Sequence, residues 1–217
     1  MSLARRALAD GLGTALLLAV VVGSGIMADK LAPGSQYLAL LANALATGFG
    51  LVALILAFAP RSGAHFNPVV TAALALRREF PARDVWPYVA AQFAGALLGV
   101  LAAHAMFDVP LIQFGAKARF GMAQWWSEIV ATFGLVFVVL SCDRKSAPFA
   151  IGAYIAAAYW FTASTSFANP AVTLARGFTA TFSGIRPGDV LPFVLAQAVG
   201  ASLAIAADRF LSGERAG

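Results

Sequence analysis

Two asparagine-proline pairs stand where their side chains could bind a polar solute. The pairs Asn67-Pro68 and Asn169-Pro170 each open a short apolar segment, 68–76 and 170–178. Asparagine favours the N-cap of a helix and proline favours its first turn, so both segments are predicted to be short helices. A capping asparagine accepts hydrogen bonds through its side-chain oxygen and keeps an NH2 group that can donate to a solute. The pairs therefore indicate two helix ends suited to neutral, hydroxyl-bearing molecules.

The composition places these pairs in a membrane protein. The chain has 217 residues, of which 60% are hydrophobic and 12% are charged, and its mean hydropathy is +0.80. Soluble domains have about 45–50% apolar and about 25% charged residues, so much of this apolar surface must face lipid. The basic residues are scattered rather than clustered, which argues against a nucleic-acid partner. A single cysteine, Cys142, cannot form an intramolecular disulfide, and no metal-binding or catalytic motif occurs in the sequence. We therefore expect no metal, no cofactor and no enzyme activity.

Six apolar stretches are long enough to cross a bilayer, whereas 68–76 and 170–178 can only enter it and return. The six predicted spans are 7–28, 37–59, 86–107, 122–141, 147–165 and 190–211. With a cytoplasmic N-terminus, most of the 15 Lys and Arg residues fall on the cytoplasmic side. This bias predicts that both termini are cytoplasmic. The inside residues are Arg5, Arg6, Arg61, Arg77, Arg78, Arg83, Arg144, Lys145, Arg209 and Arg215.

The sequence contains an internal repeat. Three segments of the first half recur in the same order in the second half: 10–14 in 128–132, 66–71 in 168–173, and 91–97 in 196–203. Each half, about 1–110 and about 120–211, is thus predicted to hold two spans, a half-helix and a third span. Because each copy crosses the membrane three times, an odd number, the second copy has the opposite orientation in the membrane. The whole chain, 1–217, is predicted to be one channel domain.

Two re-entrant segments predict a water-filled path. Non-helical backbone at membrane depth is tolerated only where protein buries it or where it lines a wet cavity. The inverted repeat brings the helix starts at Asn67 and Asn169 toward each other, and their partial positive charges repel cations. The extended backbone before them, 63–66 and 165–168, is expected to expose carbonyl acceptors opposite an apolar wall. Such a pore suits small uncharged solutes.

These motifs resemble those of the major intrinsic protein superfamily, the aquaporins and aquaglyceroporins. The stretch 62–71 is similar to the first family signature, with Val69 where alanine is usual, and Asn169-Pro170-Ala171 matches the second. The resemblance implies an all-α fold of six transmembrane helices and two half-helices, and a homotetramer in a lipid bilayer, here the bacterial inner membrane. It assigns the central constriction to six residues: Asn67, Pro68, Val69, Asn169, Pro170 and Ala171.

The resemblance also predicts a departure at the outer constriction, the selectivity filter. Val172 stands where the family usually has an arginine, so the filter is expected to be wider and more apolar. By family spacing the other filter residues are Phe49, Ser166 and a small residue on the fifth span, Ala157, with Ile155 as the alternative. Arg176, one helical turn beyond Val172, points either into an outer vestibule or toward the headgroups.

A valine at this position resembles the aquaglyceroporin-like channels associated with arsenic resistance. That resemblance implies arsenite, As(OH)3, as a permeant beside water and glycerol. As(OH)3 is a neutral triol, so it shares the hydrogen-bonding groups of a small polyol.

Three further polar residues could support the pore loops or act chemically. Asp10 and Glu128 lie in apolar spans, where they either couple protons or accept hydrogen bonds from loop amides, as the corresponding family glutamates do. His65 either gates the pore by protonation or holds the loop by packing. Gln92 and Gln197 are expected to pack beside glycines where helices cross.

Two alternatives to an open channel share these features. A secondary transporter also uses inverted repeats with broken helices, but it needs a coupling-ion site. A non-conducting structural member of the same fold is the other alternative.

Overall fold

The chain folds into a bundle of long helices around two short ones. A computed structural model describes residues 1–213. Its long helices are α1 (Leu3–Leu31), α2 (Gln36–Ser62), α4 (Val85–Met106), α5 (Met122–Ser141), α6 (Ala147–Phe161) and α8 (Val190–Leu211). Its short helices are α3 (Pro68–Leu76) and α7 (Pro170–Arg176), and single turns, Ala82–Asp84 and Pro187–Asp189, precede α4 and α8.

The long helices occupy the predicted spans. With the turns that precede them, five are long and apolar enough to cross a membrane, and α6 is a shorter apolar helix of 15 residues. The prediction for 147–165 was too long, because the chain leaves the helix at Thr162 and becomes the extended approach to Asn169. The second half-helix also ends earlier than predicted, at Arg176. The carbonyl of Arg176, the last residue of this helix, accepts a hydrogen bond from the amide of Ile185 at 3.1 Å instead of from a further helical turn.

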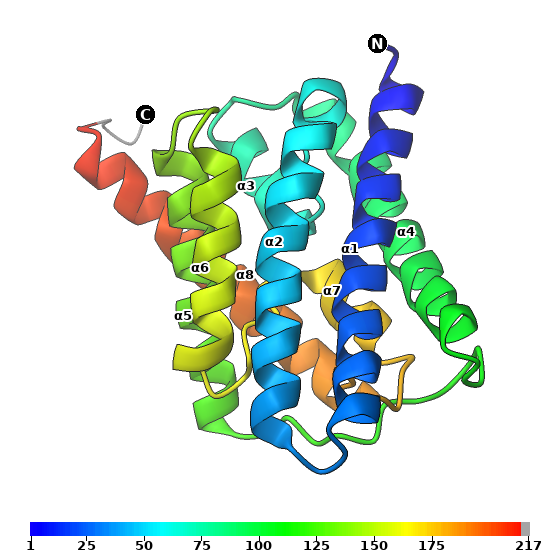
Figure 1. The fold of residues 1–217 in the computed structure, drawn as a ribbon. Helices are drawn as coiled ribbons and strands as arrows, with labels where there is room; N and C mark the ends of the chain where they lie inside the picture. Colours follow the sequence, from blue (N-terminus) through cyan, green and yellow to red (C-terminus); the bar gives the residue numbers. More distant parts are fainter. Residues whose placement is uncertain (214–217) are drawn as a thin grey trace.

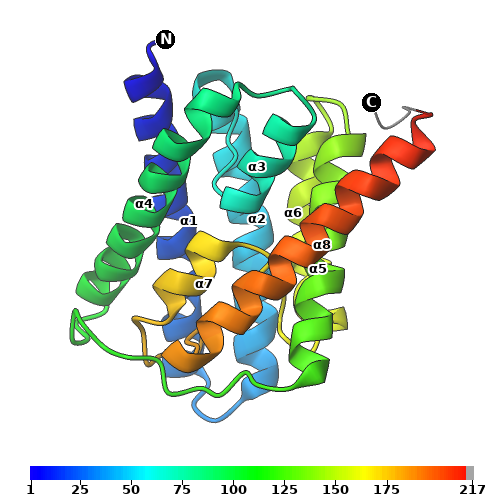
Figure 2. The same cartoon turned by 180° about the vertical axis from the view of Figure 1, so that it is seen from behind.

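The two half-helices enter the bundle from opposite ends and meet near its middle (Figure 2). Helix α1 packs along α4 in the first half, and α5 packs along α8 in the second half. Both termini lie at one end of the molecule (Figure 1). The arrangement of each half thus repeats in the other, inverted along the bundle axis.

Glycines allow the helices of each pair to cross closely. A Cβ atom at Gly95 of α4 would lie 2.0 Å from the carbonyl oxygen of Gly11 in α1. At Gly200 of α8 it would lie 2.4 Å from the carbonyl oxygen of Ile129 in α5. Both contacts are with backbone, so a side chain at either position would force the helices apart.

We expect Gly95→Ala to destabilise the protein by about 1–3 kcal/mol, the usual cost of overpacking a well-packed site. The measurement is the thermal unfolding midpoint of the purified protein in detergent. Gly188→Ala is the matched control, because no atom lies within 4 Å of a Cβ placed there. A midpoint that moves no more in Gly95→Ala than in the control would contradict the close crossing.

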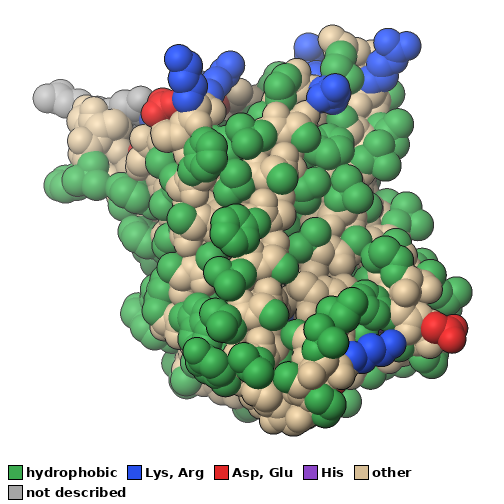
Figure 3. Space-filling model, viewed as in Figure 1, with side chains coloured by type: hydrophobic (Ala, Val, Ile, Leu, Met, Phe, Trp, Pro, Cys, Tyr) green, Lys and Arg blue, Asp and Glu red, His purple; other side chains and the backbone are tan. Residues whose placement is uncertain are grey.

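Charge is distributed unevenly along the bundle. The visible face is largely apolar, and most of its basic side chains gather at the end where α1 begins and α8 ends, although charged side chains are also visible near the opposite end (Figure 3). Arg215, one of the ten residues predicted to be inside, lies outside the described residues. The apolar face is suited to lipid, and the basic end is suited to the cytoplasmic side.

Candidate pore

The backbone that leads into each half-helix is strained. Phe66, Ser166 and Ala168 have φ values of 52°, 49° and 48°, in the left-handed region that non-glycine residues rarely adopt. Such a conformation costs roughly 1–3 kcal/mol per residue and persists only where the surroundings hold it. The two carboxylates in the spans supply the groups that hold these loops.

Asp10 binds the first loop. Its Oδ1 accepts hydrogen bonds from the Ser62 hydroxyl and the His65 amide, both at 2.9 Å. Its Oδ2 accepts from the Phe66 amide at 3.0 Å and from the Gln92 side chain at 2.7 Å. The shorter aspartate side chain therefore still reaches the loop.

Glu128 binds the second loop in the same way. It accepts hydrogen bonds from the amides of Phe167 and Ala168, each at 2.9 Å, and from the Gln197 side chain at 2.7 Å. Asp10 and Glu128 are both fully buried. Because their oxygens are engaged by loop amides, these contacts favour the supporting role over proton coupling.

The two glutamines do more than pack, which corrects the sequence-based expectation. Gln92 and Gln197 also donate to Thr71 and Thr173, at 2.9 and 2.8 Å. Each threonine hydroxyl in turn donates to the carbonyl of the asparagine that begins its half-helix. A glutamine at the equivalent place in two apolar spans could have predicted these hydrogen bonds, because a buried side-chain amide needs polar partners.

His65 is fixed in orientation by Thr71. The Thr71 hydroxyl already donates its one hydrogen to the Asn67 carbonyl at 3.0 Å, so the His65 Nδ1, 3.1 Å away, must carry a hydrogen and donate to it. The ring also packs against Phe80 and Tyr88, with centroids 4.8 and 5.3 Å away. These contacts favour the packing role over gating.

The two asparagines connect the halves. Each caps its own helix: Oδ1 of Asn67 accepts from the Val69 amide at 3.0 Å, and Oδ1 of Asn169 accepts from the Ala171 amide at 3.0 Å. Each Nδ2 then donates across the centre, from Asn67 to the Ala168 carbonyl and from Asn169 to the Phe66 carbonyl, both at 2.8 Å. One hydrogen of each NH2 group is therefore used in the protein, and one remains for a solute.

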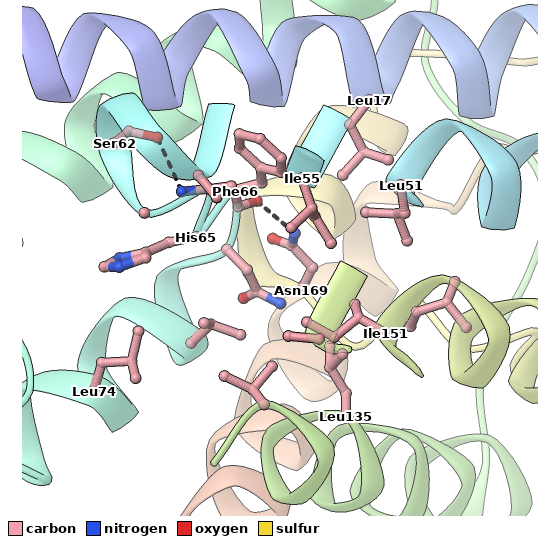
Figure 4. Close-up of a pocket in the computed structure, with 18 of the residues that line it drawn as sticks. Leu17, Leu51, Ile55, Ser62, His65, Phe66, Leu74, Leu135, Ile151 and Asn169 are labelled. Atoms are coloured by element: carbon pink, nitrogen blue, oxygen red, sulfur yellow. Dashed lines mark hydrogen bonds between the residues drawn. The ribbon is translucent and has the colours of Figure 1, made fainter. Parts of the chain in front are cut away.

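A cavity of about 790 Å³ runs past these asparagines (Figure 4). It extends from Arg61 and Arg144, at the end that carries the termini, to Arg176 in the other half. One wall is apolar, and the facing wall carries the asparagines and the extended loops. The apolar wall includes Leu17, Val21, Leu51, Ile55, Leu135, Val139, Ile151 and Ile155.

Comparison with known proteins agrees with this geometry. The family model described as major intrinsic protein matches residues 1–160. The chain belongs to the major intrinsic protein family. It is therefore a multi-pass membrane channel and not an enzyme, and the predicted all-helical aquaporin fold is confirmed.

Several relatives in this family cover nearly the whole chain. It is 55% identical over 212 residues to aquaglyceroporin AqpS of Rhizobium meliloti, covering 96% of this chain and 91% of that protein. It is 30% identical over 245 residues to aquaporin AqpM of Methanothermobacter marburgensis, covering 99% and 100%. In fold it is similar to the crystal structure of the aquaglyceroporin from Plasmodium falciparum, with a TM-score of 0.71, 21% identity and 98% of each chain covered.

Two of the filter residues expected for this major intrinsic protein do not line the cavity. Phe49 is 72% exposed on the outside of the bundle, and Ala157 is also exposed. Thr47 and Leu51 line the cavity from α2 instead, and Ile155, the stated alternative, lines it from α6. Thr47 and Leu51 are each two residues from Phe49, and two residues correspond to about 200° of rotation on a helix. The prediction therefore placed the filter on the opposite face of α2.

The remaining filter residues lie together at the outer end of the cavity. Ser166 and Val172 both line it, and Arg176 lies beside them rather than toward the headgroups. Thr47 and Tyr159, whose hydroxyl oxygens are 3.2 Å apart, also line this region. Tyr159 could not be predicted as a lining residue, because the direction of its side chain depends on the packing of α6 against α2.

Further basic side chains lie near Arg176 at this end of the cavity. Arg119, in the loop before α5, donates to the carbonyls of Ser164 at 2.7 Å and Gly184 at 3.1 Å. Burial, together with the cations of Arg119 and Arg176, lowers the pKa of the nearby Lys117 to about 8. The positive charges of Lys117, Arg119 and Arg176 therefore lie close together at this end of the cavity.

Proposed function

We propose that this channel passes small uncharged polar solutes: water, glycerol-like polyols and arsenite as As(OH)3. The observation that carries the proposal is the two-sided cavity, with an apolar wall opposite loop backbone and asparagine NH2 groups. A polyol has carbon on one side and hydroxyl groups on the other, so it fits such a lining better than an ion or a purely apolar molecule does. A solute that moves down its own concentration gradient through such a pore needs no coupling-ion site.

Val172 supports the polyol and arsenite part of this proposal. Valine is shorter than the arginine usual at this position and adds no hydrogen-bond donor or charge, so the constriction there is wider and more apolar. A neutral triol of glycerol-like character can pass such an opening. The similarity to a protein named aquaglyceroporin supports the glycerol assignment.

The proposal includes the arrangement of the channel in the cell. Both termini face the cytoplasm, because the basic end of the bundle carries them. The chain is one channel domain of two repeats, about 1–110 and about 120–211. Its central constriction is formed by the two asparagine-proline motifs, and Ser166 and Val172 belong to its filter. The membrane is a bacterial inner membrane, in keeping with the rhizobial relative, and four copies assemble as the family resemblance implies.

Uptake by proteoliposomes tests the function. Vesicles containing the purified protein are expected to take up glycerol and arsenite faster than empty vesicles, without an ion gradient and without saturation. Water flux, measured by light scattering after an osmotic step, is expected to rise as well. Vesicles that conduct only water would contradict the wide filter. Uptake that requires an ion gradient would identify a secondary transporter, and vesicles that conduct nothing would identify a structural member of the fold.

A further inference from the structure

Arg176 lies one helical turn beyond Val172, the position at which the family usually has an arginine. The two positions lie four residues apart in α7, so they share one face of the helix, with Arg176 one turn further from Asn169. Arg176 is only 2% exposed, and it lines the cavity together with Val172. A guanidinium stays protonated at all physiological pH values, so a fixed positive charge stands at this end of the lumen.

The guanidinium is held in place from two sides. Its Nε donates to the carbonyl of Ser183, and its Cζ lies 3.5 Å from the centre of the Phe167 ring. The face of an aromatic ring attracts a cation, so Phe167 stabilises the group where it stands. The Phe167 ring is itself positioned by Phe193, whose centroid is 5.2 Å away. The bond to Ser183 uses one of five N–H donors, so this group is anchored without being saturated.

The surroundings do not neutralise this charge. Arg119 lies against the same ring, with its Cζ 4.7 Å from the centroid. The nearby carboxylate of Asp189 accepts from the Arg119 amide at 2.8 Å and from the Arg186 side chain at 2.9 Å. Glu128 also acts on Arg176 and Arg119, but the four cations of this region, Lys117, Arg119, Arg176 and Arg186, outnumber its two carboxylates, Glu128 and Asp189. A cation approaching from this side therefore meets a net positive field in a narrow, partly apolar space, where repulsion is stronger than in bulk water.

We propose that Arg176 excludes cations from this channel, one helical turn outward from the position where the family carries its filter arginine. The inference rests on the proposed function, since it concerns the same lumen. It separates two tasks that one arginine performs in the usual filter. Val172 leaves the constriction wide enough for a polyol, and Arg176 keeps the charge barrier at the mouth, where it does not narrow that constriction.

The test compares an ion and a neutral solute of similar size in proteoliposomes. The ion is guanidinium, which is planar and permanently charged, and the neutral solute is glycerol. Arg176→Gln is expected to raise guanidinium uptake about tenfold, the change that follows when about 1.4 kcal/mol of repulsion is removed, while glycerol uptake changes less than twofold. Arg176→Lys, which keeps the charge, is expected to exclude guanidinium nearly as well as the natural protein. The double variant Val172→Arg with Arg176→Gln is expected to restore exclusion.

Guanidinium uptake that is equal in the natural protein and in Arg176→Gln, with glycerol uptake intact, would overturn the inference. Equal leaks in the lysine and glutamine variants would overturn it as well, because they would show that charge is not what matters. If Arg176→Gln gives no glycerol flux, Arg176→His tests the role of the charge instead, because a change of pH alters the charge at this position within a single variant. Relative to the natural protein at the same pH, which corrects for the titration of Lys117, its guanidinium leak is expected to be greater at pH 8, where histidine is neutral, than at pH 5. Equal relative leaks at the two pH values would contradict the inference. Absence of glycerol flux in the natural protein would instead refute the proposed function.

Discussion

Glu128→Ala is expected to abolish glycerol flux and to lower the stability of the protein by several kcal/mol. The change leaves the amides of Phe167 and Ala168 and the Gln197 side chain without their acceptor. Each buried donor left unpaired costs about 1–3 kcal/mol. The loop that these bonds hold contains backbone at positive φ, which relaxes once it is released. The outer part of the lumen then loses its shape.

Two measurements check this prediction, the thermal unfolding midpoint in detergent and glycerol uptake by proteoliposomes. Asp29→Ala is the matched control, because it removes an acidic side chain that is exposed near the end of α1. Asp10→Ala is expected to act like Glu128→Ala, since Asp10 has the same role in the first loop. Normal uptake by Glu128→Ala would show that the loop holds its shape without the carboxylate.

Val172→Arg has the second largest expected effect, a loss of selectivity for larger solutes. The new side chain enters the lumen at a residue that is now 5% exposed and lies beside Ser166 and Arg176. A long charged side chain narrows the opening and adds a second fixed charge. We expect glycerol and arsenite uptake to fall at least about tenfold, the effect of a barrier higher by about 1.4 kcal/mol, and water flux to fall much less.

The decisive quantity is the ratio of glycerol flux to water flux in the same vesicles. Val172→Ile is the control, since it adds one carbon to the same apolar side chain and is expected to change the ratio little. Equal losses of both fluxes would indicate a misfolded protein. Glycerol and water fluxes that both stay as in the natural protein would mean that Val172 does not limit the passage of solutes.

Local signals in the sequence were enough to predict the half-helices and their supports. An asparagine followed by proline fixes a helix start with its own hydrogen bonds, and α3 accordingly covers Pro68–Leu76 as predicted. The carboxylates at Asp10 and Glu128 were identifiable because a charged group inside an apolar span needs partners. The repeat paired segment 10–14 with 128–132, so the two carboxylates were expected at equivalent positions of the two halves.

Side-chain directions that depend on distant segments could not be predicted in this way. The lumen-facing side of α2 depends on its packing against α1 and α6, so Phe49 was assigned to the wrong face. Arg176 had two possible directions because its anchors, Ser183 and Phe167, come from other parts of the chain. The fifth span was drawn too long because residues 162–165 are small or hydroxylated and interrupt neither hydropathy nor charge.

The crossed bonds between the two asparagines and the opposite loops have a consequence for how the protein is made and how it can change. Each half supplies the acceptor that the asparagine of the other half requires. Neither half alone can complete the hydrogen bonding at its own helix start, so the conduction path forms only when both have been inserted and have met. The centres of the two halves therefore cannot change independently. A substitution that moves the loop carbonyl of one half removes the acceptor of the asparagine in the other half.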